Sequence, residues 1–208
     1  MHTTHSITGI ILAGGVSRRM GSDKAFLRLG STTVIEELIG RLKNVFVDIV
    51  CIANDREKYE QFGIPTVADR IPGKGPIGGI YTGLLVSRTP SVFVFACDAP
   101  FVHEGLINSM IRRANEGDII VPKWNGRLEP LHAIYSKKCI DPIEYRLRNN
   151  ELKMSKYVSD SNAVILEKEL KMFQLGQNPF RNLNTPDDYE AALAESRELS
   201  GIPLRHIA

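Results

Sequence analysis

Near its N-terminus the chain carries Leu12-Ala13-Gly14-Gly15-Val16-Ser17-Arg18-Arg19-Met20-Gly21-Ser22-Asp23-Lys24, directly after an apolar run over residues 7–12. The apolar run predicts a buried first strand. Two adjacent glycines at its end let backbone N–H groups come close to a bound group. A glycine turn followed by several cations suits a polyphosphate. The stretch is not a Walker A loop, because only two residues separate Gly21 from Lys24 and no Ser or Thr follows the lysine.

The bulk composition is that of one ordinary globular domain. We expect a single domain over residues 1–208, with a core over about 7–193 and a C-terminal tail at 200–208. Hydrophobic residues make up 43% of the chain and charged residues 24%, which predicts a packed core rather than disorder. The net charge is only +2, from 26 basic and 24 acidic residues, and this argues against a nucleic-acid binder.

The sequence favours a cytoplasmic protein. The cysteines, Cys51, Cys97 and Cys139, are far apart and odd in number, which favours free buried thiols over a disulfide or a metal site. The first six residues lack the basic start and apolar run of a signal peptide. No apolar stretch approaches the roughly 20 residues that a membrane span needs.

Apolar runs alternate with helical periodicity over residues 7–121. The expected strands are residues 7–12, 46–53, 64–68, 92–96 and 118–121. The expected helices are residues 34–42, capped by Thr32 or Thr33, then 80–86 and 103–115, with irregular backbone over 70–79. This alternation is typical of βαβ units. We therefore expect an α/β fold of three layers, in which a mostly parallel sheet has helices on both faces.

The second half of the chain has a different pattern. Residues 124–127 resemble a turn and residues 129–135 a strand after it. Helices are expected at 143–147 and 150–160, and short strands at 164–166 and 172–175. Thr185 is expected to cap a final helix that has Pro186 at its first position.

Polar residues follow several of the expected strands. In parallel sheets, ligands bind beyond the carboxyl ends of the strands, so we expect loop 14–24, Asn54, Asp69 and Asp98 to converge there. Asp98 suits a divalent metal beside phosphates, because magnesium takes few carboxylates plus phosphate oxygens. The plain alternative for Asp98 is a turn or helix-capping aspartate. For Lys24 and Arg19 the alternative is a solvated side chain.

A second glycine pattern points to a different ligand. The stretch Gly73-Lys74-Gly75-Pro76-Ile77-Gly78 matches G-x-G-x-x-G, and Asp98 follows Gly78 by twenty residues, as in a dinucleotide-binding fingerprint. That fingerprint needs a tight turn between strand and helix, whereas residues 69–72 separate this match from the preceding strand. The pattern is therefore weak support for a nicotinamide or flavin cofactor.

Other polar and aromatic residues have ordinary explanations beside the functional ones. Asn182 and Asn184 alternate, so an extended backbone points both to one side, but loop and cap chemistry also explains them. His132, on an apolar strand, is expected to be a core histidine. Trp124 and Arg127 beside a glycine turn suit either stacking on a flat ring or an exposed turn.

Several motifs of the chain together resemble one family. The stretch from Leu12 to Lys24 is similar to the signature of nucleotidyltransferases with a nucleotide-diphospho-sugar-transferase type of fold. Four later motifs resemble, in the same order, those of the molybdenum cofactor guanylyltransferase family: Gly75-Pro76-Ile77-Gly78-Gly79-Ile80, Cys97-Asp98-Ala99-Pro100, Glu129-Pro130-Leu131-His132-Ala133-Ile134-Tyr135 and Asn182-Leu183-Asn184-Thr185-Pro186. The first motif marks the superfamily, and the last two narrow the resemblance to this branch.

The resemblance implies a Rossmann-like fold and the transfer of GMP from GTP to the terminal phosphate of molybdopterin, with release of pyrophosphate. It further implies that the nucleotide is held by Leu12, Ala13, Gly14, Gly15, Asn54, Asp69 and the loop around Gly78. Lys24, Arg19 and Asp98 are the implied catalytic residues, with Asp98 also binding Mg²⁺, and Asn182 and Asn184 lie toward the pterin. The implied partners are GTP, molybdopterin, and molybdenum-insertion and molybdoenzyme chaperone proteins, without nucleic acid or membrane.

The implied chemistry agrees with the residue types. An attacking phosphate and a triphosphate repel each other, so catalysis needs cations and positioning more than a nucleophilic side chain. Two other functions stay open at this point. One is the same fold with CTP or a sugar-phosphate acceptor, and the other is a non-catalytic nucleotide-binding protein that delivers the cofactor.

Overall fold

The computed structural model describes residues 7–13, 24–173, 175 and 178–199. Within these ranges the chain forms a mixed sheet with the strand order β10-β7-β9-β6-β1-β4-β5, and β8 pairs with β7. The strands are β1 (Thr8–Leu12), β4 (Ile49–Ile52), β5 (Thr66–Val67), β6 (Ser91–Ala96), β7 (Ile119–Trp124), β8 (Arg127–Leu128), β9 (His132–Ser136) and β10 (Ala163–Leu166). A separate hairpin joins β2 (Arg28–Leu29) to β3 (Thr32–Thr33).

The sheet is mostly parallel, as expected. Strand β1 pairs in parallel with β4 and β6, β4 with β5, and β7 with β10. Strand β9 runs antiparallel between β6 and β7. As a result β9 begins at the edge of the sheet where β1, β4, β5 and β6 end.

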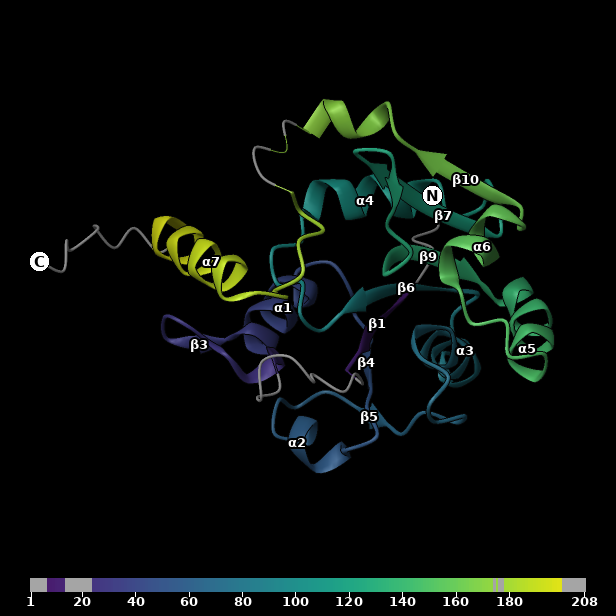
Figure 1. Cartoon of the computed structure of the whole chain (residues 1–208), viewed down its shortest axis with the longest axis horizontal. Coiled ribbons are helices and arrows are strands. Elements are labelled where there is room, and N and C mark those ends of the chain that lie inside the picture. Colours follow the sequence, from purple (N-terminus) through teal and green to yellow (C-terminus); the bar gives the residue numbers. More distant parts are fainter. Residues whose placement is uncertain (1–6, 14–23, 174, 176–177, 200–208) are drawn as a thin grey trace, which may run out of the picture.

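Helices cover both faces of the sheet, which confirms the three-layer α/β prediction. They are α1 (Val34–Lys43), α2 (Arg56–Glu60), α3 (Pro76–Val86), α4 (Glu104–Arg112), α5 (Ile140–Arg148), α6 (Met154–Ser159) and α7 (Pro186–Leu199), with 3₁₀ turns at η1 (Lys24–Phe26), η2 (Lys137–Cys139) and η3 (Glu169–Phe173). Figure 1 shows α3 and α5 on one side of β1 and β6, and α1 and α4 on the other. No helix in the described ranges is long and apolar enough to cross a membrane.

The alternation of side chains along β6 builds a core on each face. Phe93 and Phe95 pack in one apolar cluster with residues of α1 and α4. Val92 and Val94 pack in the other, with residues of α3, α5 and α6. Both faces of the central strand are thus covered, which explains why residues 92–96 are apolar without interruption.

The sequence predictions for three elements were wrong in position, type or length. Helix α3 begins at Pro76 and not at residue 80, because proline is accepted at the first helical position, where its missing N–H has no intrahelical partner. Met172 and Phe173 belong to the 3₁₀ turn η3 and not to a strand. The expected strand 46–53 is shorter, since β4 begins at Ile49, while Phe46 packs edge-on against Phe93 and Phe95.

The C-terminal segment folds back onto the start of the chain. Thr185 caps α7 as expected, since its hydroxyl accepts a hydrogen bond from the Asp188 amide at 3.1 Å. Leu183 is fully buried in a small cluster with Leu29 and Val34. This packing brings segment 182–185 to the edge of the sheet where the parallel strands end.

Replacing either of two helical glycines by alanine is expected to change the free energy of unfolding, in opposite directions for the two positions. A Cβ on Gly83 of α3 would lie 3.0–3.3 Å from three atoms of the fully buried Ile10, so Gly83→Ala should lower the free energy of unfolding by about 1–3 kcal/mol. Gly40 of α1 has nothing within 4 Å of the same position, so Gly40→Ala should raise it by about 0.5–1 kcal/mol. Urea unfolding of both variants measures this, and equal changes would contradict the packing described for α3.

Candidate functional site

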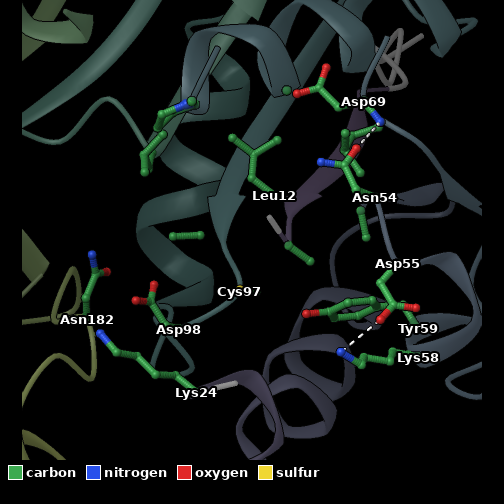
Figure 2. A pocket seen from close by; sticks show the side chains of 18 of the residues that line it. Leu12, Lys24, Asn54, Asp55, Lys58, Tyr59, Asp69, Cys97, Asp98 and Asn182 are labelled. Carbon is green, nitrogen blue, oxygen red and sulfur yellow. Dashed lines mark hydrogen bonds and ion pairs between the residues drawn. The ribbon is translucent and has the colours of Figure 1, made fainter. Parts of the chain in front are cut away.

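A cavity of about 670 Å³ opens at the carboxyl ends of the parallel strands. It is lined by Leu12, Ala13, Lys24, Ile52, Ala53, Asn54, Asp55, Lys58, Tyr59, Asp69, Gly73, Gly75, Pro76, Gly79, Ala96, Cys97, Asp98, Leu131 and Asn182. Figure 2 shows Lys24, Asp98 and Asn182 at one end of this cavity, and Asn54 and Asp69 at the other. Of the residues that were predicted to converge, Lys24, Asn54, Asp69 and Asp98 line this one cavity, while residues 14–23 lie outside the described ranges.

Among the described residues, the end around Asp98 combines the ammonium group of Lys24 with the half-buried carboxyl group of Asp98. The Lys24 Nζ donates a 2.7 Å hydrogen bond to Asn184 Oδ1. The Leu183 amide donates to the Asp98 carbonyl at 3.0 Å, which fixes the C-terminal segment beside the end of β6. Burial raises the pKa of the Asp98 carboxyl, and the positive charge of Lys24 opposes this rise. A further positive group at this carboxyl would therefore be favoured.

The opposite end is built around Asp69. Its Oδ1 accepts hydrogen bonds from the Thr82 hydroxyl at 2.8 Å and the Ile71 amide at 3.2 Å. The Asp69 amide in turn donates to Asn54 Oδ1 at 3.2 Å. The carboxylate is thus held in one orientation, with its other oxygen, Oδ2, close to Gly78, where a Cβ would lie 3.1 Å away. Gly78 lies behind Asp69 and does not line the cavity, whereas Gly75 and Gly79 do.

The remaining predicted residues of the first motif divide into two groups. Leu12 and Ala13 line the cavity. Gly14, Gly15 and Arg19 lie outside the described residues, as does the tail 200–208. The G-x-G-x-x-G stretch is not in the tight strand-to-helix turn of a dinucleotide fingerprint, because residues 68–75 separate the end of β5 from the start of α3.

Three lining residues were missed by the sequence reasoning. Asp55, Lys58 and Tyr59 come from α2 and its N-terminal flank, and Lys58 forms a 2.8 Å ion pair with Asp55. Both charged side chains are more than half exposed. A short helix with ordinary surface charges carries no sequence signal that sets it apart, so only its position after β4 identifies these residues.

His132 has the predicted character, and the cysteines have it in part. Cys51 and Cys139 are buried as predicted, whereas Cys97 is half-buried in the cavity wall. His132 is buried among Phe93, Phe95 and Phe180, each edge-on to its ring at 5.0–5.2 Å. Burial lowers the pKa of His132 to about 3, so the imidazole is neutral at physiological pH.

A smaller cavity of about 170 Å³ adjoins the main one. It is lined by Phe95, Ala96, Ala99, Glu129, Pro130, Leu131, His132, Phe180 and Asn182, of which Ala96, Leu131 and Asn182 also line the main cavity. Trp124 packs edge-on against Phe180 with ring centroids 6.1 Å apart, so in this structure it contacts the wall of the small cavity. The sequence placed a motif here but assigned no role to Glu129.

The residues of the main cavity suit a nucleotide with a polyphosphate. In the described part of the chain no cluster of three or more His, Cys, Asp or Glu forms a metal-binding group. A single carboxylate is nevertheless a sufficient protein ligand for magnesium bound to phosphates, because the remaining ligands are phosphate oxygens and water. The donor set at Asp98 therefore fits a divalent cation that arrives with the nucleotide.

Known proteins similar to this chain share most of its length. The family model of the MobA-like NTP transferase domain matches residues 9–162. A probable molybdenum cofactor guanylyltransferase of Pelotomaculum thermopropionicum is 36% identical over 182 residues, covering 87% of this chain and 89% of the relative. The molybdenum cofactor guanylyltransferase of Desulfosudis oleivorans is 33% identical over 192 residues, covering 91% and 95%. The crystal structure of molybdopterin-guanine dinucleotide biosynthesis protein A from Archaeoglobus fulgidus has a TM-score of 0.78 and 26% identity, over 94% of this chain and 99% of that one.

Proposed function

Because the chain belongs to the MobA-like NTP transferase family, we propose that it transfers GMP from GTP to molybdopterin. A terminal phosphate oxygen of molybdopterin attacks the α-phosphorus of GTP, the bond from that phosphorus to the bridging oxygen breaks, and pyrophosphate leaves. The product is the guanine dinucleotide form of the molybdenum cofactor. The observation that carries the proposal is the cavity with Lys24 and Asp98 at one end and the fixed Asp69 at the other.

The nucleotide lies along the carboxyl ends of β5, β4, β1 and β6 in this proposal. Asn54 and Asp69 face the guanosine, and Leu12, Ala13, Gly14 and Gly15 surround the phosphates. Gly78 supports this site from behind, because any side chain there would press on the Asp69 carboxylate. Lys24 and Arg19 neutralise the phosphates, and Asn182 and Asn184 lie on the side of the acceptor, where Asn184 holds Lys24.

A divalent cation, Mg²⁺, is proposed to accompany the triphosphate and to be held by Asp98. When bound, it supplies positive charge for the α-phosphate and the leaving pyrophosphate. The chain's own contribution is positional: the Leu183 amide holds the backbone of Asp98, and Asn184 holds the Lys24 ammonium. Because attack and departure occur at phosphorus, no covalent intermediate with the protein is needed.

Pyrophosphate release measured with each of GTP, CTP, ATP and UTP tests the proposal directly. The assay contains molybdopterin, magnesium and the full-length chain. We expect release with GTP that depends on molybdopterin, together with formation of the dinucleotide. Release with CTP alone would replace the guanylyl assignment by a cytidylyl one, and tight GTP binding without any turnover would indicate a delivery protein.

We place this enzyme in the cytoplasm, as one domain spanning the chain. Cys51 and Cys139 are buried cysteines outside any disulfide among the described residues, which supports a reducing compartment. Its proposed partners, which the resemblance to the family implies, are molybdenum-insertion and molybdoenzyme chaperone proteins.

A further inference from the structure

The strand order fixes the order in which the site residues lie along one edge of the sheet. Read along one edge of the sheet, Asp69 follows β5, Asn54 follows β4, Leu12 ends β1, Asp98 follows β6, and His132 begins β9. The pairing of His132 with Phe95 places the start of the antiparallel β9 beside the end of β6. With neighbouring strands about 4.8 Å apart, the edge from β5 to β9 spans roughly 19 Å. The two ends of this edge are therefore far enough apart for two different rings to bind, one at each end.

The small cavity lies at the β9 end of this edge. Asp98 therefore lies between the small cavity and the end proposed to bind the guanosine. A volume of about 170 Å³ is below the roughly 300–1,000 Å³ of a pocket for a complete ligand, so it fits one ring system of a larger molecule. Because Ala96, Leu131 and Asn182 line both cavities, a molecule whose phosphate is at Asp98 can extend into the small one.

The turn that carries Glu129 is held in place by its own hydrogen bonds. The Glu129 amide donates to the Pro122 carbonyl at 2.9 Å, and the His132 amide donates to the Glu129 carbonyl at 3.0 Å. The Tyr135 hydroxyl donates to the Pro130 carbonyl at 2.8 Å. The backbone of Glu129 is therefore preorganised, which lowers the entropy cost of binding a ligand there.

Two polar side chains of this cavity lack partners in the part of the chain that the structure describes. Within the described ranges, neither a hydrogen bond nor an ion pair satisfies the Glu129 carboxyl, and the buried Nε2 of His132 is without a partner. Burial raises the pKa of Glu129 to about 7, against the opposing charge of Arg127. Partly buried polar groups that remain unsatisfied cost stability, and a ligand with matching donors removes that cost.

We propose that the small cavity binds the ring of the acceptor. Glu129 recognises the edge of that ring that carries its hydrogen-bond donors. An ionised carboxylate is acceptor-only and binds two adjacent N–H groups in a bidentate manner. A ring N–H beside an amino group, the 2-amino-4-oxo edge of a pterin, is such a pair. Phe180 and Leu131 supply apolar walls for the ring, and this subsite rests on the function proposed above.

Guanine has the same pair of hydrogen-bond donors as a pterin, so the experiment must distinguish whether Glu129 binds the pterin or the guanine. We compare steady-state kinetics of the wild type and Glu129→Gln with GTP, with ITP and with molybdopterin. ITP lacks the 2-amino group of GTP. An amide in place of the carboxylate presents an N–H₂ group to the ring donors, so the KM for molybdopterin should rise about 10- to 100-fold. The KM for GTP and the preference for GTP over ITP should stay as in the wild type.

A pair of inhibitors gives a second readout that does not use molybdopterin. A simple pterin should inhibit the wild type more strongly than the matching lumazine, which carries an oxo group in place of the 2-amino group. Glu129→Gln should lose this discrimination. Glu167→Gln is the matched control, because Glu167 is half exposed, pairs with Lys123 at 3.2 Å and lines neither cavity. It should change neither KM nor the inhibitor preference.

Each contrary result has a separate meaning. A raised KM for GTP with loss of the preference over ITP would overturn the subsite and assign Glu129 to guanine. Unchanged constants throughout would overturn it as well. If Glu129→Gln does not fold, Glu129→Asp, which withdraws the carboxylate by one methylene, is judged by the same comparison. A wild type that forms no dinucleotide from GTP would instead refute the proposed function.

Discussion

Asp98→Asn is expected to lower kcat by about 10³-fold, since a cation held at this carboxylate supplies several kcal/mol of charge stabilisation in the transition state. The amide keeps the size and shape of the side chain, removes its charge and replaces one acceptor oxygen by an N–H₂ group. The carbonyl of residue 98 still accepts the Leu183 amide, so the C-terminal segment should stay in place. The KM for GTP should change much less than kcat, because the remaining cavity residues still bind the nucleotide.

Initial rates of pyrophosphate release at saturating GTP and molybdopterin measure this effect. Asp141→Asn is the control, because Asp141 is an exposed residue of α5 that lines neither cavity. The pH dependence supplies a second check. Since burial raises the pKa of Asp98, the carboxylate should be lost at a higher pH than an ordinary aspartate on acidification, and kcat/KM should fall with it. A variant that keeps most of its kcat would show that Asp98 is a structural turn residue.

The fold could be predicted from the sequence wherever local pattern decides structure. The continuous apolar run of β6 and the helical spacing of Ile35, Leu38 and Leu42 in α1 were both interpreted correctly. The start of α3 was not, because its glycines indicate irregular backbone when considered alone. Their reason is tertiary: Gly83 makes room for Ile10, and Gly78 for Asp69. Contacts between residues far apart in sequence leave no local pattern.

The candidate site could be predicted in part for the same reason. Asn54, Asp69 and Asp98 each follow a parallel strand, so topology alone brings them together. The contact of Lys24 with Asn184 joins two ends of the chain and depends on how Leu183 packs. Glu129 reaches the site only because β9 enters the sheet antiparallel, and no periodicity distinguishes a parallel strand from an antiparallel one of this length.

The contact between Lys24 and Asn184 leads to the second large expected effect. An ammonium group beside the phosphates offsets negative charge that builds up on the leaving pyrophosphate, and losing one such donor costs about 10²–10³-fold in kcat. Lys24→Gln should show this loss. It should also move the acid limb of the pH profile to higher pH, because Lys24 is the charge that lowers the pKa of Asp98. Lys138→Gln, whose side chain is 81% exposed, should change neither quantity.

Asn184 is expected to act through Lys24, and a double-mutant cycle separates this role from direct binding of the acceptor. The 2.7 Å hydrogen bond holds the ammonium in one place, so Asn184→Ala should lower kcat by about tenfold in the wild-type background. In the Lys24→Gln background the same change should have almost no effect on kcat, because the group being positioned is gone. Equal losses in both backgrounds would mean that Asn184 contacts the substrate itself, and a rise confined to the KM for molybdopterin would assign that contact to the acceptor.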